Sequence, residues 1–384
     1  MMAKLGDVCT IVSGTTPKTS VSEYWDGDIN WITPAELNED TVVINESKRK
    51  ITKAGVNSCG LSPFPAGTVI LSSRAPIGKT AIAGTEMYCN QGFKNLICSD
   101  KIHNKYLFWF LRSKTEMLNS LGRGATFKEI SKSIVENIEI PLPDISEQRR
   151  IADTLDKVSE GIEVCRKMVD ELDLMVKAKF VEMFGDVFDN PKNFKMCLFG
   201  DYASQMNIGP FGSDLKNDSF VSKENGYCMV YEQKHAIDKN MLVEARYVTE
   251  EKYQQMKRFN IGPGDIIVSC RGTIGKCFIL PDDAPHGIIH PSLMMIKPQN
   301  TVNHTFLLFL LESILKEQQE QGTGVKMAIK ASELAKIKCI APPRELQDSY
   351  VTFVSQINKS KLTIQGILDK METEKLALMQ EYFG

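Results

Sequence analysis

The chain has 384 residues, of which 42% are hydrophobic and 24% are charged, and its formal net charge is −2 at pH 7. This length favours two or three domains, and the composition excludes a disordered chain. The near-neutral charge excludes a protein coated in basic surface, although one basic face would suffice to bind nucleic acid. We find neither the apolar core of a signal peptide nor an apolar run as long as a membrane span, so we expect a cytoplasmic protein without a membrane partner.

The first 140 or so residues read as a mixture of strands, turns and short helices. In YWDGDINWITP, Trp25 and Trp31 could stack on nucleic-acid bases, although burial between strands is the commoner fate of such aromatics. In VILSSRAPIGK (69–79), a glycine-containing turn follows an apolar strand and places Arg74 and Lys79 five residues apart. Such a turn can present backbone N–H groups and two cations to a phosphate. The alternative is a plain hairpin turn with solvated charges.

A glycine-rich loop, LGRGATFKEI (121–130), follows the apolar segment LFWFLRS (107–113). It places Arg123, Thr126 and Lys128 beside two glycines, which suits a surface that follows a nucleic-acid groove. The alternative is that the glycines only supply a positive φ angle before a helix.

A long helix is predicted after Pro143, because apolar positions there recur with alternating steps of four and three. That heptad pattern is typical of a coiled-coil seam. The seam consists of Ile151, Leu155, Val158, Ile162, Cys165, Val169, Leu172 and Val176.

The second half of the chain repeats the first. IIVSCRGTIGK (266–276) is identical to residues 69–79 at six of eleven positions, 197 residues further on, and it places Arg271 and Lys276 as the first copy places Arg74 and Lys79. LLFLLES (307–313) matches LFWFLRS, and QGTGVKMAIK (321–330) matches the glycine-rich loop, with Lys326 and Lys330 as its cations. A period near 197 is far too long for a solenoid, whose repeats run roughly 20–50 residues, so the chain is a duplicated domain.

A second seam follows Pro343 at an offset of 199 residues and in the same phase. It consists of Tyr350, Val354, Ile357, Lys361, Ile364, Leu368, Met371 and Lys375. A stripe this narrow needs a partner helix, and the simplest partner is the other copy. The periodicity leaves open whether the two helices pair parallel or antiparallel, and the alternative is that each packs onto its own globular unit.

Motifs of catalysis are absent from the sequence. We find no nucleotide-binding glycine motif, no H-E-x-x-H, no G-x-S-x-G and no tetrapeptide of the amino-methyltransferases, so we expect no catalytic residues. The ten cysteines lie singly and suit reduced thiols. His286 and His290 have metal-like spacing and lie near Cys270 and Cys277 in sequence, so a zinc site is conceivable; the alternative is that all four are loop and core residues.

The chain resembles the specificity subunit of type I restriction–modification systems. The resemblance rests on YWDGDINWITPAEL, on the paired S-x-R-x-x-I-G-K strands, and on PLPDISEQRRIADTLDKV, and it continues in the second copy through PPRELQDSYVTFVSQINKSK to LMQEYFG. The second copy departs from the pattern with Leu346-Gln347-Asp348 where the first has Glu147-Gln148-Arg149, so residue roles do not carry over there.

The resemblance implies an α+β fold in which two duplicated mixed α/β target-recognition domains are separated by two long helices. Residues 1–145 and 187–344 would be target-recognition domains 1 and 2. Residues 146–186 and 345–384 would be the central and distal spacer helices, which form an antiparallel coiled coil with a pseudo-twofold.

The resemblance also implies that each globular unit reads one half of a bipartite double-stranded DNA target. The helices would dock two modification subunits, which methylate adenine with S-adenosylmethionine, and a restriction subunit that uses ATP and Mg would join through the complex. This chain would bind no cofactor itself. The rival hypotheses are a coiled-coil protein-interaction scaffold without DNA recognition and, less well supported by the motifs, a self-sufficient nuclease.

Overall fold

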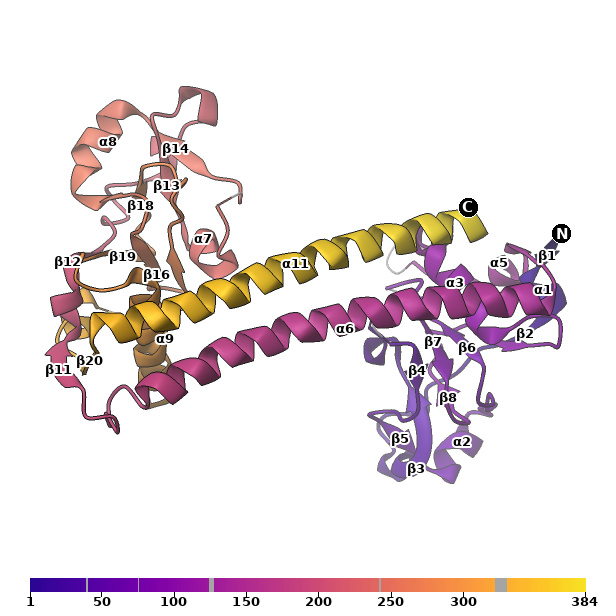
Figure 1. Cartoon of the computed structure of the whole chain (residues 1–384). Coiled ribbons are helices and arrows are strands. Elements are labelled where there is room, and N and C mark those ends of the chain that lie inside the picture. Colours follow the sequence, from indigo (N-terminus) through magenta and orange to yellow (C-terminus); the bar gives the residue numbers. More distant parts are fainter. Residues whose placement is uncertain (39–40, 75, 124–127, 242, 322–329) are drawn as a thin grey trace. The chain divides into compact units, whose positions relative to one another are not determined.

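The computed structural model describes residues 1–38, 41–74, 76–123, 128–241, 243–321 and 330–384, which fall into two compact units (Figure 1). Unit 1 combines residues Met1–Lys167 with Ile364–Gly384, and unit 2 is Met168–Thr363. Two long helices, α6 (Ile145–Phe184) and α11 (Arg344–Phe383), therefore each contribute one segment to each unit. No helix of the described residues is long and apolar enough to cross a membrane.

The largest sheet that the described part of unit 1 forms has five strands and packs against helix α3 (Asn104–Ser113). Its order is β2 (Cys9–Val12), β9 (Asn95–Cys98), β6 (Val69–Leu71), β7 (Thr80–Ala83), β4 (Val43–Ile44). A smaller three-stranded sheet has the order β5 (Lys50–Ile51), β3 (Trp25–Ile32), β8 (Tyr88–Cys89). A two-stranded sheet pairs β1 (Met2–Lys4) with β10 (Glu139–Pro141). The remaining helices are α1 (Leu5–Val8), α2 (Lys53–Ser58), α4 (Thr115–Leu121) and α5 (Lys132–Glu136).

Unit 2 repeats this topology with different side chains. Its main sheet has the order β12 (Ala203–Ile208), β19 (Leu293–Pro298), β16 (Ile266–Ser269), β17 (Cys277–Ile279). A second sheet has the order β14 (Arg246–Val248), β13 (Cys228–Tyr231), β18 (Gly287–Ile289), β15 (Asn260–Ile261), and β11 (Lys195–Leu198) pairs with β20 (Lys338–Ala341). The helices are α7 (Gln233–Asp238), α8 (Glu250–Met256), α9 (His304–Gln321) and α10 (Ala331–Leu334). The strands β12-β19-β16-β17 correspond in order and pairing to β2-β9-β6-β7, which confirms the duplicated α+β fold.

Within unit 1, the segments of the two long helices run antiparallel. Arg166 of α6 forms an ion pair with Glu372 of α11 at 2.9 Å, whereas Arg150, near the start of α6, lies over the ring of Tyr382 at the far end of α11. The Met371 methyl lies against the place that a Cβ at residue 161 would take, so a side chain there would make the flexible end of Met371 move.

The helix segments of unit 2 are antiparallel as well. The Tyr350 hydroxyl donates to the Val176 carbonyl at 3.3 Å, and Lys361 pairs with Asp173 at 2.6 Å. Lys361, one of the two lysines of the second seam, thus forms an ion pair with a carboxylate of the other helix.

The seam residues are all shielded from solvent to some degree. Those that are buried are Ile151, Leu155, Ile162, Val176, Tyr350, Val354, Ile357 and Leu368, and those that are half-buried are Val158, Cys165, Val169, Leu172, Lys361, Ile364, Met371 and Lys375. Ile151 and Leu155 also join the core of unit 1, so the start of α6 packs both on its own globular unit and beside α11.

A buried glutamine anchors the start of each long helix. Gln148 accepts a hydrogen bond from the His103 backbone N–H at 2.8 Å and donates to the carbonyls of Lys101 and Pro143. Gln347 accepts from the Asn303 N–H at 2.9 Å and donates to the Pro342 carbonyl at 3.0 Å. The glutamine therefore makes the structural contacts in both Glu147-Gln148-Arg149 and Leu346-Gln347-Asp348. The residues on either side of it differ between the two tripeptides, but its anchoring hydrogen bonds are present in both.

We predict that Gln148→Leu destabilises the protein by about 1–3 kcal/mol, because the apolar side chain leaves a buried N–H and two carbonyls without partners. Urea unfolding should show a lower midpoint for this variant. Gln365→Leu, on an exposed face of α11, is the matched control and should change the midpoint little. Equal midpoints for both variants would show that the buried amide does not hold the helix in place.

Candidate nucleic-acid interface

The repeated motif forms the same hairpin turn in both units. In unit 1 the buried Ser72 hydroxyl donates to the Pro76 carbonyl at 2.7 Å and accepts from the Lys79 N–H at 2.9 Å. In unit 2 Ser269 makes the equivalent bonds, to the Thr273 carbonyl at 2.6 Å and from the Lys276 N–H at 2.9 Å. Each serine thus closes the turn from inside.

The turn also explains the repeated glycine. Gly78 and Gly275 have φ angles of 93° and 83°, a region that side chains rarely allow, and each donates its N–H to the serine carbonyl. The serine and glycine of the motif therefore build the turn, and only its arginine and lysine remain as candidates for binding DNA.

In unit 1 both of these cations already have protein partners. Arg74 forms an ion pair with Glu129 at 2.8 Å, and the Lys79 ammonium donates to the Leu37 carbonyl at 2.5 Å. The other carboxylate oxygen of Glu129 accepts a hydrogen bond from the Lys94 ammonium at 3.1 Å. The Lys94 side chain is only 8% exposed. Glu129 thus links an exposed arginine to a buried lysine.

In unit 2 the equivalent cations are exposed. Arg271 and Lys276 form no ion pair with any described residue, and the Gln233 side chain fixes the turn from outside by donating to the Arg271 and Thr273 carbonyls. The two hairpins share a backbone but present their charges differently.

The described ends of the glycine-rich loop, residues 121–123 and 128–130, lie against the hairpin of unit 1. The Glu129 and Arg123 backbones exchange hydrogen bonds at 2.9 and 3.0 Å, and the Ile130 N–H donates to the Ser73 carbonyl at 3.0 Å. The structure therefore brings Arg123 and Lys128, both exposed, to the same edge as Arg74. Electrostatically this edge can hold a phosphate, since its cations lie on neighbouring backbone segments.

Two of the other loop candidates, Thr126 and Lys326, lie outside the described residues. Lys330, at the start of α10, is exposed and forms an ion pair with Glu333 at 2.8 Å.

The two tryptophans are part of the core. Trp25 and Trp31 are buried edge to face, 5.1 Å apart, and their indole N–H groups donate to the carbonyls of Lys18 and Thr15. Neither is available to stack on a base. Arg49 covers the Trp25 ring at 3.7 Å.

The conceivable zinc ligands do not assemble. Nowhere in the described residues do three His, Cys, Asp or Glu side chains lie close enough to hold a metal ion. Burial raises the pKa of Cys270 to about 12, and that of Cys277 is raised for the same reason, so both thiols are held in the protonated form that metals bind poorly. His290 instead bonds to Ser292 at 2.9 Å through its Nδ1.

The sequence matches the family of type I restriction modification DNA specificity domains over residues 1–174 and 214–373. The chain belongs to this family. It is 29% identical to the type I restriction enzyme MjaIX specificity subunit of Methanocaldococcus jannaschii over 371 aligned residues. The alignment covers 92% of this chain and 85% of that protein.

Solved structures show the same fold at low identity. A chain from a study of assembly and conformational transition in a type I restriction–modification system superposes with a TM-score of 0.68 at 18% identity, covering 100% of this chain and 97% of that one. The type I S subunit from M. genitalium gives a TM-score of 0.55 at 14% identity, covering 100% and 96%.

Sequence reasoning missed two charged residues, Lys94 and Glu129, at the edge that carries Arg74. Lys94 interrupts the apolar strand run FKNLIC, which is a signal for a buried cation in need of a carboxylate. Nothing in the sequence identifies Glu129 as that carboxylate, because the two lie 35 residues apart.

Glu129 should therefore stabilise unit 1. Burial alone would raise its pKa, but hydrogen bonds from Arg74 and Lys94 outweigh burial and lower the pKa below its usual range. We predict that Glu129→Gln costs about 1–3 kcal/mol near neutral pH, since it leaves the Lys94 ammonium buried without a counter-charge.

A lowered carboxyl pKa contributes stability above the unfolded value and loses it as the pH falls through the folded value. The gap in urea midpoint between the parent chain and Glu129→Gln should accordingly narrow in acid. Glu136→Gln removes an exposed ion pair with Lys132 and serves as the control. A gap that is constant with pH would rule out the charge as its cause.

Proposed function

We propose that this chain is the DNA-reading subunit of a type I restriction–modification complex, with unit 1 and unit 2 each reading one half of a bipartite target in double-stranded DNA. The observation that carries the proposal is the duplicated unit: one backbone framework is built twice, and its equivalent hairpins present the same arginine and lysine in different environments. A protein that reads two unlike half-sites needs the same docking frame twice with different side chains facing the bases.

Under this proposal the chain supplies recognition and not chemistry. Methylation of adenine with S-adenosylmethionine belongs to two modification subunits, and cleavage with ATP and Mg belongs to restriction subunits that join the complex. The cations of the two hairpins and of the glycine-rich loops then hold phosphates, which position the protein without reading sequence.

The outer faces of the long helices support docking of the modification subunits. In unit 2, α6 exposes Leu174 and Val181, 63% and 62% accessible and two helical turns apart. Met168 and Met175 repeat that spacing, and α11 of the same unit exposes Leu362. Apolar side chains spaced by seven residues outside the seam suit partner helices.

We predict that Arg271→Gln with Lys276→Gln weakens DNA binding by the assembled complex more than Arg74→Gln with Lys79→Gln does. The cations of unit 2 are exposed, whereas those of unit 1 are engaged by Glu129 and the Leu37 carbonyl. The slope of log affinity against log salt should become shallower by about 0.9 for each phosphate that the variant no longer neutralises. Titration of specific and random DNA at several salt concentrations measures both effects.

Lys338→Gln, an exposed cation in β20, is the control for general charge. If both double variants matched this control on every DNA, the hairpins would not bind phosphate. A complex that bound no DNA at all while retaining its protein partners would favour the coiled-coil scaffold instead.

We further predict that Leu174→Glu with Val181→Glu reduces capture of the modification subunit at least tenfold, because charges would replace the apolar side chains of the outer face. Co-purification with a tagged modification subunit measures the reduction. Leu198→Glu alters an exposed leucine of β11, which belongs to neither long helix, and should leave capture intact. Unchanged capture by the double variant would place the docking surface elsewhere.

A further inference from the structure

Two cysteines of unit 2 lie directly opposite each other in its small two-stranded sheet. The strands β11 and β20 pair antiparallel, and their register sets Cys197 against Cys339. Directly opposed residues of such a pair have their side chains on the same face, with Cβ atoms about 4.5–5.5 Å apart. Cys339 is fully buried, whereas Cys197 is half-buried in a strand whose other residues are exposed.

The ladder gives the two cysteines a spacing that a disulfide can bridge. The Phe199 N–H donates to the Ile337 carbonyl at 2.8 Å, so these two residues form a hydrogen-bonded pair. Hydrogen-bonded and non-hydrogen-bonded pairs alternate along an antiparallel ladder. Cys197 and Cys339, two positions further along, are therefore a hydrogen-bonded pair with Cα atoms about 5.5 Å apart. Since disulfides join Cα atoms about 4.4–6.8 Å apart, the backbone permits this bond.

Cys197 is the more reactive member of the pair. A hydrogen bond from the Cys339 thiol is the main cause that lowers the pKa of Cys197 to about 7; burial and the charge of Asp201 oppose the lowering, and a hydrogen bond from the Tyr202 hydroxyl adds to it. The pKa of Cys339 is raised by the same hydrogen bond and by burial. Near neutral pH, Cys197 is therefore partly the nucleophilic thiolate, while Cys339 keeps its proton.

The Tyr202 hydroxyl is held beside the pair. It donates to the Ile340 carbonyl, next to Cys339, at 2.9 Å. Burial raises the pKa of Tyr202, so the hydroxyl keeps its proton. That single proton can serve the carbonyl while Cys197 is a thiol and the sulfur once Cys197 is ionised.

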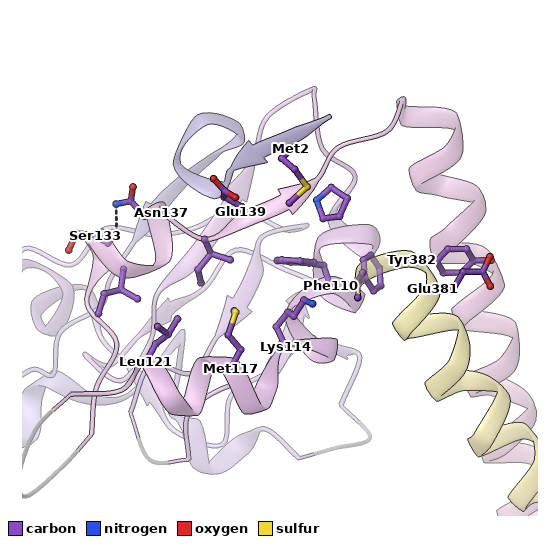
Figure 2. A pocket seen from close by; sticks show the side chains of 15 residues that line it. Met2, Phe110, Lys114, Met117, Leu121, Ser133, Asn137, Glu139, Glu381 and Tyr382 are labelled. Atoms are coloured by element: carbon purple, nitrogen blue, oxygen red, sulfur yellow. Dashed lines mark hydrogen bonds between the residues drawn. The ribbon is translucent and has the colours of Figure 1, made fainter.

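The corresponding place in unit 1 has no sulfur. There the pair of β1 with β10 sets Ala3 against Ile140 in the same register, in the region that Figure 2 shows, where Met2 marks β1. The Leu5 N–H donates to the Ile138 carbonyl at 2.9 Å, as the equivalent residues of unit 2 do, which establishes the correspondence. The shared framework therefore forms without thiols at this position.

We propose that Cys197 and Cys339 form a peroxide-sensitive dithiol that closes to a disulfide. The Cys197 thiolate attacks one oxygen of hydrogen peroxide and the O–O bond breaks. That oxygen stays on the sulfur as a sulfenic acid, and the hydroxide that leaves takes up a proton to become water. The Cys339 sulfur then attacks the Cys197 sulfur, the S–O bond breaks, and the oxygen leaves as a second water with the proton of Cys339. Two thiols thus lose two electrons, and the peroxide is reduced to two waters.

The disulfide would join the strand that follows α6 to the strand that precedes α11. The loop that it closes contains both larger sheets of unit 2, from β12 to β19. A cross-link between positions so distant in sequence restricts the unfolded chain and leaves the folded one as it is. The oxidised protein should therefore unfold at a higher urea concentration than the reduced protein. The proposal is independent of DNA recognition, because it uses no residue of the hairpins.

The test treats the full chain with hydrogen peroxide near pH 7 and maps its disulfides by mass spectrometry of a digest made without reductant. We expect Cys197 to be linked to Cys339, the link to be released by dithiothreitol, and the urea midpoint to fall back on release. No disulfide, or a link from Cys197 mainly to another cysteine or to a second chain, would overturn the proposal.

Two variants separate the steps of the reaction. Cys197→Ser should abolish the disulfide and leave no sulfenic acid at this site. Cys339→Ala should instead leave a sulfenic acid on Cys197, which a 1,3-dione reagent traps, because the thiol that resolves it is gone. Circular dichroism checks that both variants fold, as the sulfur-free pair of unit 1 leads us to expect. A trapped sulfenic acid on Cys339 in Cys197→Ser, with none on Cys197 in Cys339→Ala, would overturn the assigned roles.

A second cross-strand pair is the internal control. Cys9 and Cys98 oppose each other in β2 and β9 of unit 1, but a hydrogen bond with Cys98 and burial raise the pKa of Cys9. At pH 7 this pair should oxidise more slowly than Cys197 with Cys339, and the reverse order would count against the proposal.

The pH dependence of alkylation tests the state of Cys197. The rate with iodoacetamide, taken as the difference between the parent chain and Cys197→Ser, should rise with pH around a midpoint near 7. Tyr202→Phe should raise this midpoint, because it removes a donor to the thiolate. A midpoint of about 8.5 in the parent chain, the value of a free cysteine, would remove the cause of its reactivity and equally overturn the proposal.

Discussion

The structure depends on the closure of each apolar core by a helix segment that is distant in sequence. In unit 1, Phe383 lies 5.3 Å from Tyr106 and 5.8 Å from Phe110, so the last turn of α11 completes a core that begins at Leu5. In unit 2, Phe184 packs against Phe306 at 4.9 Å. Because burial of such aromatics is the main driving force for folding, neither globular unit is complete without both long helices.

The two units share the buried framework of the specificity domain but differ in the environments of their surface residues. The serine and glycine of the hairpin, the glutamine at the helix start and the phenylalanine at the helix end recur because each satisfies a buried bond or fills a core position. The cations of the hairpin recur in sequence but not in environment: Arg74 is bound by Glu129, whereas Arg271 is exposed. A residue that is identical in both repeats therefore indicates a shared backbone geometry more directly than it indicates a shared ligand contact.

Local pattern in the sequence determined the duplication, the two long helices and their seam, because heptad spacing and repeated motifs are properties of neighbouring residues. The α+β class followed from the resemblance to a known family. The same patterns did not determine the direction of helix pairing, since a heptad seam is the same read either way; pairs such as Arg166 with Glu372 and Tyr350 with Val176 decided it.

The candidate cations of the interface followed from their spacing, but which of them are free did not. Glu129 reaches Arg74 and Lys94 across 55 and 35 residues, and the tryptophans are removed from the surface by packing against each other. Charge pairing and burial at such separations depend on how the backbone folds back on itself, and therefore only the tertiary structure could decide them.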